Sequence, residues 1–222
     1  MSEPRIISVF NSKGGSGKTT LSMLIAGTLG SWGHETLVVD ADPQGTAYRW
    51  SRGPTGDGAF PARAIRAGDD RPVHESVRDA VAGGEWDYVI IDCPPSIESP
   101  APQSALMVSD LALVPVLPTP GDVWAVHGAL ELAESVRREV NKLLVAGLVP
   151  NQMVRTNVAE TAYETIQQIA EQHSVYTLAP MSRRTAIQEA SALGRIPGDL
   201  GRRGSEPKID AERLTEEVLN VL

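Results

Sequence analysis

Residues 9–20, Val9-Phe10-Asn11-Ser12-Lys13-Gly14-Gly15-Ser16-Gly17-Lys18-Thr19-Thr20, end an apolar run and open a helical pattern. Three glycines let the backbone turn its N–H groups inward around an anion, and the helix that follows adds the positive end of its dipole. Lys18 would then reach the β- and γ-phosphates of a nucleotide, and the Thr19 hydroxyl would bind Mg²⁺. A loop that only turns does not call for Gly-Lys-Thr, so the stretch predicts a phosphate-binding loop.

This loop departs from the common pattern G-x-x-x-x-G-K-[ST]. Ser12 stands where that pattern has its first glycine, and a second lysine, Lys13, precedes a glycine pair. Lys13 has no obvious role in a loop that already has Lys18. We expect the loop to bind ATP through Lys13, Gly14, Gly15, Ser16, Gly17, Lys18, Thr19 and Thr20.

Length and composition favour one α/β domain. We expect the 222 residues to form a single domain, 1–222, with no separate N-terminal DNA-reading domain. The formal net charge is −8, so any nucleic-acid binding must come from a local basic patch. The single cysteine, Cys93, excludes an intrachain disulfide and a cysteine-rich metal site, and the four histidines lack metal-ligand spacing.

The sequence shows no targeting or membrane-spanning signal. Residues 1–5 are polar, and the later apolar runs are too short to span a bilayer. A membrane-surface helix needs basic residues on its polar face, whereas residues 210–219 carry acidic ones there. We therefore expect a cytoplasmic protein with no membrane partner.

Apolar runs alternate with helical patterns along the chain. We expect strands over residues 5–10, 36–40, 60–67, 87–92, 111–117, 142–149 and 175–178. We expect helices over residues 18–30, 44–52, 72–83, 101–109, 121–140, 156–173, 184–193 and 207–222, with Gly30 and Gly33 ending the first and an irregular segment over 195–206. The fold class that follows is α/β: a single P-loop NTPase domain with a mostly parallel, twisted sheet and helices on both faces.

Acidic residues end two of the predicted strands, where an open parallel sheet binds its ligands. At Asp92 a carboxylate would hold Mg²⁺, usually through water; a helix-capping or turn aspartate is the alternative. We expect at most one of Asp40 and Asp42 to face the γ-phosphate unless the chain turns at Ala41. That carboxylate could orient the attacking water, and the other could support Mg²⁺ or Thr19.

Three segments together resemble the ParA family of deviant-Walker ATPases, which is related to MinD. They are the loop at residues 13–19, the run Asp-Ala-Asp-Pro-Gln-Gly at 40–45, and Asp-Tyr-Val-Ile-Ile-Asp at 87–92. Residues 108–116 also look like the family's next strand. The short chain most resembles the small plasmid-partition ATPases of the ParF type.

The resemblance implies an ATP-hydrolysing protein that forms a homodimer when it binds MgATP. In the family, the lysine at the position of Lys13 reaches across the dimer interface to the ATP of the other subunit; a solvated loop lysine is the alternative. Lys13, Lys18 and Asp42 are therefore the expected catalytic residues, with Asp42 positioning the water. The expected Mg²⁺ residues are Thr19, Asp40 and Asp92, with Asp40 in support.

Two loops receive roles from the same resemblance. Residues 94–96, Pro-Pro-Ser, fall where the family has a switch segment, with a rigid loop as the alternative. Family members contact adenine from the loop that follows the strand near residues 148–150. Asn151 and Gln152 are the candidates here, although polar loop residues are often simply solvated.

Five arginines concentrate positive charge in the C-terminal part of this acidic chain: Arg183, Arg184, Arg195, Arg202 and Arg203. The resemblance implies that the ATP-bound dimer binds nonspecific DNA through such residues, which contact phosphates without reading sequence. The ATP-bound protein would then be nucleoid-associated. A scattered, solvated surface is the alternative, because proximity in sequence need not place residues on one face.

The resemblance also implies a partner, either ParB-like or another small adaptor protein, that stimulates hydrolysis and supplies the cargo. We expect segregation of plasmid or chromosomal DNA, with release from DNA on hydrolysis. One alternative is positioning of a protein cargo, as for a carboxysome. Another is a small-molecule phosphoryl-transfer enzyme of the same fold, such as dethiobiotin synthetase; Lys13 with Asp-Pro-Gln argues against it.

Overall fold

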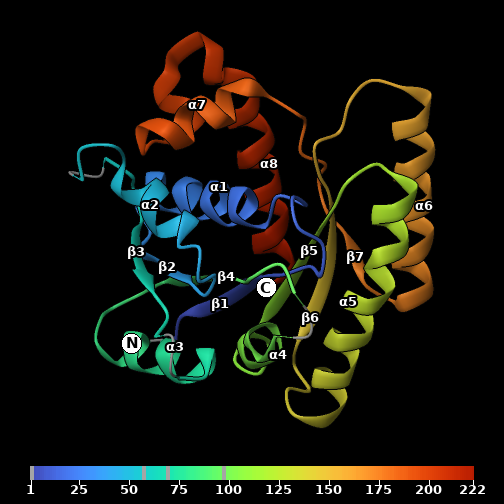
Figure 1. Ribbon diagram of the computed structural model, residues 1–222, viewed down its shortest axis with the longest axis horizontal. Coiled ribbons are helices and arrows are strands. Elements are labelled where there is room, and N and C mark those ends of the chain that lie inside the picture. Colours follow the sequence, from blue (N-terminus) through green and yellow to red (C-terminus); the bar gives the residue numbers. More distant parts are fainter. Residues whose placement is uncertain (1–2, 57–58, 69–70, 97–98) are drawn as a thin grey trace.

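The computed structural model describes residues 3–56, 59–68, 71–96 and 99–222 (Figure 1). Its strands are β1 (Arg5–Val9), β2 (Thr36–Asp40), β3 (Arg63–Arg66), β4 (Tyr88–Asp92), β5 (Leu111–Val116), β6 (Val145–Pro150) and β7 (Tyr176–Thr177). They form one seven-stranded sheet in the order β3-β2-β4-β1-β5-β6-β7, and every pairing is parallel.

Two layers of helices cover this sheet (Figure 1). The helices are α1 (Lys18–Ser31), α2 (Thr46–Arg52), α3 (Val73–Ala82), α4 (Pro100–Leu106), α5 (Pro120–Glu139), α6 (Asn157–His173), α7 (Thr185–Leu193) and α8 (Ser205–Val221), with the 3-10 helix η1 (Pro197–Gly204) before the last. Helices α1, α2, α7 and α8 lie on one face, and α3 to α6 lie on the other. The predicted parallel sheet with helices on both faces is confirmed.

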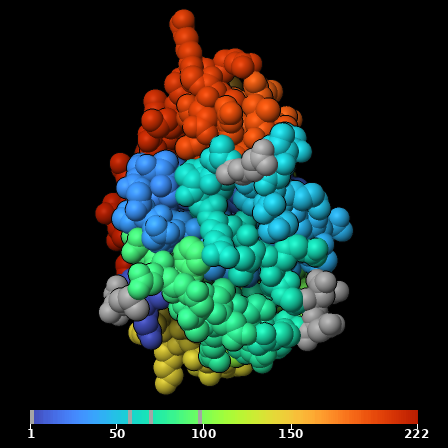
Figure 2. Space-filling model, turned by 90° about the vertical axis from the view of Figure 1, so that its left-hand side faces the viewer, coloured from blue at the N-terminus to red at the C-terminus, as the bar shows by residue number. Residues whose placement is uncertain are grey.

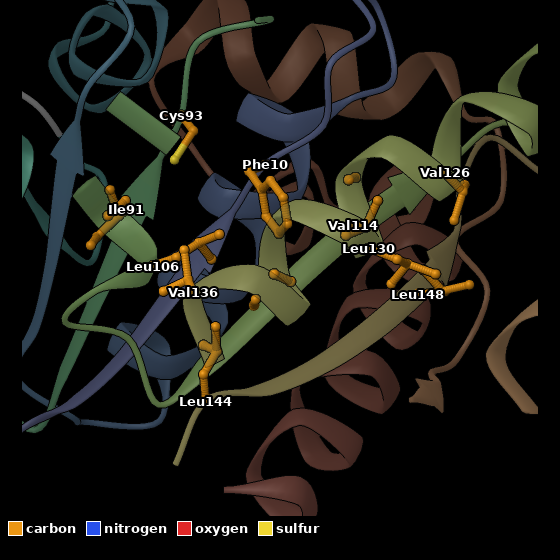
Figure 3. Close-up of a cluster of buried hydrophobic side chains, with 14 of the residues drawn as sticks. Phe10, Ile91, Cys93, Leu106, Val114, Val126, Leu130, Val136, Leu144 and Leu148 are labelled. Atoms are coloured by element: carbon orange, nitrogen blue, oxygen red, sulfur yellow. The ribbon is translucent and has the colours of Figure 1, made fainter. Parts of the chain in front are cut away.

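The double covering explains why the central strands are continuously apolar. All residues of β2 and β5 are buried, because the side chains on each face of the sheet pack against a layer of helices. Under α3 to α6, alternate residues such as Phe10, Ile91 and Val114 form one core (Figure 3). Their neighbours Ile7, Ile90 and Leu113 point to the other face and pack with α1 and α8.

The predicted end of the first helix is correct to within one residue: α1 ends at Ser31, and Gly33 follows with a left-handed φ of 91°. Gly30 lies inside the helix, where the backbone of Pro61 packs against it: a Cβ there would lie 2.3 Å from the Pro61 carbonyl oxygen.

Other bounds differ more, since α4 ends at Leu106 rather than at 109 and β6 begins at Val145 rather than at 142. Most of the segment expected to be irregular is η1, whose turns bend at Gly201, where φ is 61°.

The strand order places the phosphate loop at the centre of the sheet. Strand β1 lies between β4 and β5. The chain leaves β1 for β2 toward one edge and leaves β5 for β6 toward the other, and such a switch point opens a crevice at the carboxyl ends of the strands, where ligands bind. Among the described residues, no helix is long and apolar enough to cross a bilayer.

Candidate nucleotide site

The phosphate loop joins β1 to α1 with its backbone donors unused. Gly15 and Gly17 have left-handed φ angles of 78° and 92°, which glycine adopts without strain. Within the described part of the chain, the N–H groups from Gly14 to Lys18 donate no hydrogen bond, and the buried Ser16 hydroxyl has no partner. Free donors around a loop at a helix N-terminus fit a phosphate group.

Lys18 lies across this loop rather than in solvent. Its Nζ donates to the Lys13 carbonyl oxygen at 3.0 Å, and only 6% of the residue is exposed. Burial lowers the pKa of Lys18, while the charges of Asp92, Cys93 and Asp42 act in the opposite direction. A bound phosphate would compensate for this desolvation, as the prediction for Lys18 requires.

Thr19 and Asp92, which separate motifs predict to bind Mg²⁺, lie in contact. The Thr19 hydroxyl donates to Asp92 Oδ2 at 2.7 Å, and the Ser22 hydroxyl donates to Asp92 Oδ1 at 3.0 Å. Asp92 is fully buried, and this burial raises its pKa to about 7 against the opposing effect of the Thr19 hydrogen bond. A hydroxyl and a carboxylate in contact beside a phosphate loop are oxygen donors of the kind that Mg²⁺ prefers, so the residues fit the ion.

Sequence reasoning missed Ser22. It lies three residues after Thr19, on the same face of α1, and this spacing was the available signal.

Asp40 and Asp42 flank a turn. Asp40 ends β2 directly beside Asp92 of β4, and its two carboxylate oxygens accept the N–H groups of Asp42 and Tyr48. Burial raises the pKa of Asp40, and these two hydrogen bonds partly offset the shift. The chain turns after Asp42, whose carbonyl accepts the Gly45 N–H, so the turn occurs one residue later than Ala41.

This geometry gives Asp40 a structural task at the start of α2. It leaves the supporting Mg²⁺ role of Asp40 and the water-positioning role of Asp42 as predictions.

Asn151 and Gln152 contact the phosphate loop itself. The Asn151 amide donates to the Ser16 carbonyl at 2.8 Å, and the Gln152 amide donates to the Gly15 carbonyl at 3.4 Å. A Cβ at Gly17 would lie 2.2 Å from Asn151 Nδ2, so the contact also requires a glycine there. Both residues therefore brace the loop, and their proposed contact with adenine stays a prediction.

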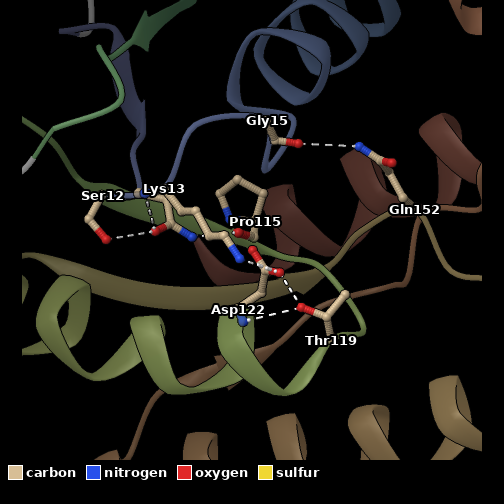
Figure 4. A network of polar contacts seen from close by, with 8 residues as sticks. Ser12, Lys13, Gly15, Pro115, Thr119, Asp122 and Gln152 are labelled. Carbon is tan, nitrogen blue, oxygen red and sulfur yellow. Dashed lines mark hydrogen bonds and ion pairs between the residues drawn. The ribbon is translucent and has the colours of Figure 1, made fainter.

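Lys13 forms an ion pair that the sequence did not reveal (Figure 4). Its Nζ lies 2.7 Å from Oδ2 of Asp122, in the first turn of α5. The Asp122 carboxylate also contacts the Thr119 hydroxyl. Asp122 follows β5 at the same edge of the sheet as Asp40 and Asp92, and the run Thr-Pro-Gly-Asp has the spacing of a helix start, which was the signal that could have found it.

The segment expected to be a switch adjoins the loop. A Cβ at Gly14 would lie 4.0 Å from that of Pro95, which places Pro95 in contact range of the glycine pair. Residues 94–96 thus lie where a nucleotide-dependent change in the loop could reach them, and their switching role stays a prediction.

The five arginines lie in or beside α7, η1 and the start of α8, which form one end of the molecule (Figure 2). Two of them are paired with acids: Arg184 lies 2.7 Å from Glu206, and Arg203 lies 2.9 Å from Glu189. Residues 183–206 still carry a net charge of +2 in a chain of −8. The structure brings the arginines into one region, and DNA binding by them remains a prediction.

Comparison with known proteins places this site in a family. Residues 7–197 match the family model described as the CobQ/CobB/MinD/ParA nucleotide binding domain. The chain is 32% identical to the maintenance of carboxysome distribution protein A of Halothiobacillus neapolitanus, over 96% of this chain and 95% of that protein. It is 26% identical to the chromosome partitioning protein ParA of Caulobacter vibrioides, over 97% and 94% of the two chains.

Solved structures share the fold. A complex of a Cyanothece McdA variant with ATP superposes with a TM-score of 0.79 at 19% identity, covering 100% of this chain and 97% of that one. Cobyrinic acid a,c-diamide synthase from Mycobacterium smegmatis, with bound ADP and magnesium, superposes with a TM-score of 0.74 at 22% identity, covering 98% and 94%.

Proposed function

The chain belongs to the CobQ/CobB/MinD/ParA family of nucleotide-binding domains and is an ATPase that uses MgATP, and we propose that it is an ATP-driven positioning protein. In this proposal two subunits dimerise face to face when both bind MgATP. The dimer binds nonspecific DNA, and hydrolysis stimulated by a partner protein releases it.

One observation carries the proposal: a second lysine stands at the edge of a complete phosphate loop. Lys18, Thr19 and Asp92 already supply the contacts that a nucleotide and Mg²⁺ need. Lys13 is not required within that set, and its side chain is 43% exposed beside the loop. A cation in this position is suited to neutralise the triphosphate of a facing subunit.

Within the subunit, each loop residue has a task that follows from its contacts. The free N–H groups of the loop bind the phosphates, and Lys18 neutralises the β- and γ-phosphates. Thr19 and Asp92 would hold Mg²⁺, which supplies charge neutralisation on the phosphates when bound. Asp42, at the turn after β2, is the candidate to orient the attacking water.

The arginines of α7, η1 and α8 are the proposed DNA surface. Contacts to phosphates give salt-dependent binding without sequence preference. Because dimerisation would place two such surfaces on one particle, binding should require ATP.

The cargo has two candidates. The similarity to ParA and the arginine-rich end support segregation of plasmid or chromosomal DNA through a ParB-like or other small adaptor protein. The similarity to a carboxysome distribution protein over nearly the full length of both chains supports positioning of a protein assembly. The ATPase cycle is the same in both cases, and the adaptor determines the cargo.

The experiment compares Lys13→Ala with Lys18→Ala, using Lys142→Ala as the control for loss of a lysine outside the loop. Nucleotide affinity is measured with a fluorescent ATP analogue, and mass is measured by light scattering with ATP or ADP. Lys18→Ala should lose nucleotide binding, whereas Lys13→Ala should bind nucleotide and stay monomeric. If Lys13→Ala dimerises and hydrolyses ATP like the Lys142→Ala control, the proposal is wrong.

Product analysis separates the remaining enzyme alternative. A positioning ATPase releases free phosphate, whereas a small-molecule phosphoryl-transfer enzyme yields a phosphorylated metabolite. The protein is supplied with DNA and ATP alone, and the free phosphate released is compared with the ATP consumed. Equal amounts support the positioning ATPase.

A further inference from the structure

Lys13 is paired in the single chain with a carboxylate that the proposed cycle does not use. Its Nζ lies 2.7 Å from Asp122 Oδ2 (Figure 4). The Lys13 side chain is 43% exposed, and the Asp122 side chain is 4% exposed. The second carboxylate oxygen, Oδ1, is buried without a hydrogen-bond partner among the described residues. The charge of this buried carboxylate is stabilised by the cation beside it and by the Thr119 hydroxyl, which donates to Oδ2.

Helix capping does not account for the Asp122 carboxylate. Asp122 follows the N-cap residue Thr119 with capping-box spacing, in which the acid would accept the N–H of the N-cap residue. Here the Thr119 N–H donates to the Leu117 carbonyl at 2.8 Å instead. Thr119 caps α5 through its own hydroxyl, which accepts the Asp122 N–H. The carboxylate is therefore available to Lys13.

The Lys13 backbone is fixed while its side chain is free to change direction. The Lys13 N–H donates to Asn11 Oδ1 at 3.2 Å, and the Asn11 amide donates to the Pro115 carbonyl of β5 at 2.8 Å. The Lys13 side chain is 43% exposed, and a Cβ at Gly121 would be in van der Waals contact with its ammonium group, 3.8 Å from Nζ. The ammonium can thus leave Asp122 without movement of the loop.

We propose that Asp122 is a positioning residue that keeps Lys13 on its own subunit until the triphosphate of a second subunit replaces the carboxylate. The inference rests on the proposed function, in which Lys13 acts across a dimer. One ammonium group cannot pair fully with both anions, and its departure leaves the Asp122 charge buried without its cation. The ion pair therefore opposes dimerisation, and the charge of a triphosphate is needed to overcome it.

The first test uses the nucleotide-free chain and does not depend on dimerisation. Lys13→Gln, Asp122→Asn and the double variant are unfolded in urea, and their free energies form a double-mutant cycle. The two substitutions should be non-additive, with a favourable coupling between the native side chains. Additive effects would overturn the inference whether or not the protein dimerises. Asp122→Ser, which keeps a polar residue in the first helical turn, replaces Asp122→Asn if that variant does not fold.

The second test measures dimerisation by light scattering with a non-hydrolysable ATP analogue. Asp122→Asn should dimerise at a protein concentration on the order of tenfold lower than wild type. Glu131→Gln, which removes the same charge from an exposed position of α5, should behave like wild type. In the Lys13→Gln background, Asp122→Asn should give no improvement, a result that a purely structural role of Asp122 would not produce.

The outcomes separate the two proposals. If the first test shows coupling but Asp122→Asn dimerises no better than wild type in the second, that combination overturns the inference and leaves the proposed function in place. A wild-type protein that never dimerises with ATP overturns the proposed function, and the inference falls with it.

Discussion

At the residue scale, the nucleotide site depends on Gly17, whose lack of a side chain leaves room for the side chain of a neighbouring residue. Gly17 has a φ of 92°, and a Cβ there would meet the amide of Asn151 at 2.2 Å. Asn151 is buried, and its amide is bonded to the Ser16 carbonyl. Displacing it would therefore break a brace of the loop.

Gly17→Ala should lower the free energy of unfolding by about 2–4 kcal/mol, from backbone strain and the clash together, and should abolish ATP binding. Gly33→Ala is the matched control, because Gly33 has a φ of 91° with open space around its Cβ position. It should lose only about 1 kcal/mol and bind ATP normally. Urea unfolding and titration with a fluorescent ATP analogue measure both effects; equal losses in the two variants would contradict the role of Asn151.

A second residue-scale prediction concerns Ser22. Ser22→Ala leaves Asp92 Oδ1 buried without its hydroxyl donor, so the free energy of unfolding should fall by about 1–3 kcal/mol. Ser135→Ala is the control, since that hydroxyl bonds an exposed glutamate within α5 and should change stability by less than about 0.5 kcal/mol. Urea unfolding of nucleotide-free protein distinguishes the two, and a Ser22→Ala variant as stable as the control would show that Asp92 needs only Thr19.

Sequence could predict residues whose partner is a nucleotide, but it missed several whose partner is another side chain. Lys18, Thr19 and Asp92 stand in motifs fixed by the geometry of a phosphate and a metal ion. Ser22 and Asp122 are placed by tertiary contacts, because each meets a residue 70 or more positions away, or one from another element. The local signals, which are the three-residue spacing from Thr19 and the helix start at residues 119–122, mark candidate positions but do not identify the partner of either residue.

At the element scale, α1 shows how packing selects a residue that helices otherwise disfavour. Gly30 is a poor helix former, yet it lies within α1, one residue before its end. The backbone at Pro61 occupies the space that a side chain there would need. The central strands β1, β2, β4 and β5 could be predicted to within one residue at each end, because burial on both faces leaves an unbroken apolar run.

Gly30→Ala should therefore destabilise the protein by about 1–3 kcal/mol, although alanine is the better helix former by about 1 kcal/mol. The obstacle is a backbone carbonyl, which cannot rotate away as a side chain would. Ser31→Ala, the next residue of α1, should stay within about 1 kcal/mol of wild type. Thermal or urea unfolding measures both; a stabilised Gly30→Ala would contradict the packing argument.

At the scale of the whole molecule, the arginine-rich end lies on α7, η1 and α8, apart from the phosphate loop in sequence but in the same domain. The sequence predicted the charge but not whether the arginines lie together, since that depends on how η1 folds between α7 and α8. Salt bridges from Arg184 and Arg203 to acids limit the charge that is available for DNA.

Arg202→Ala/Arg203→Ala should weaken binding of the ATP-bound protein to random duplex DNA. The slope of log K against log [salt] should become shallower by about 1–2, since Arg203 is partly neutralised by Glu189. Arg137→Ala/Arg138→Ala, at the end of α5, removes the same charge elsewhere and should leave binding unchanged. Fluorescence anisotropy at several salt concentrations measures both. Equal binding with and without nucleotide, or equal loss in the two variants, would contradict the assigned surface.

The central claim is that Lys13 serves the nucleotide of another subunit, and mixing two inactive variants tests it most directly. Lys13→Ala keeps a complete phosphate loop but has no lysine to offer, whereas Asp42→Ala binds ATP and offers Lys13 but lacks the carboxylate proposed to orient the attacking water. In an equal mixture, about a quarter of the wild-type ATP turnover per site should return, because half of randomly paired dimers are mixed and each contains one complete site. A mixture whose turnover equals only the average of the two separate variants would show that Lys13 acts within its own subunit and would contradict the account.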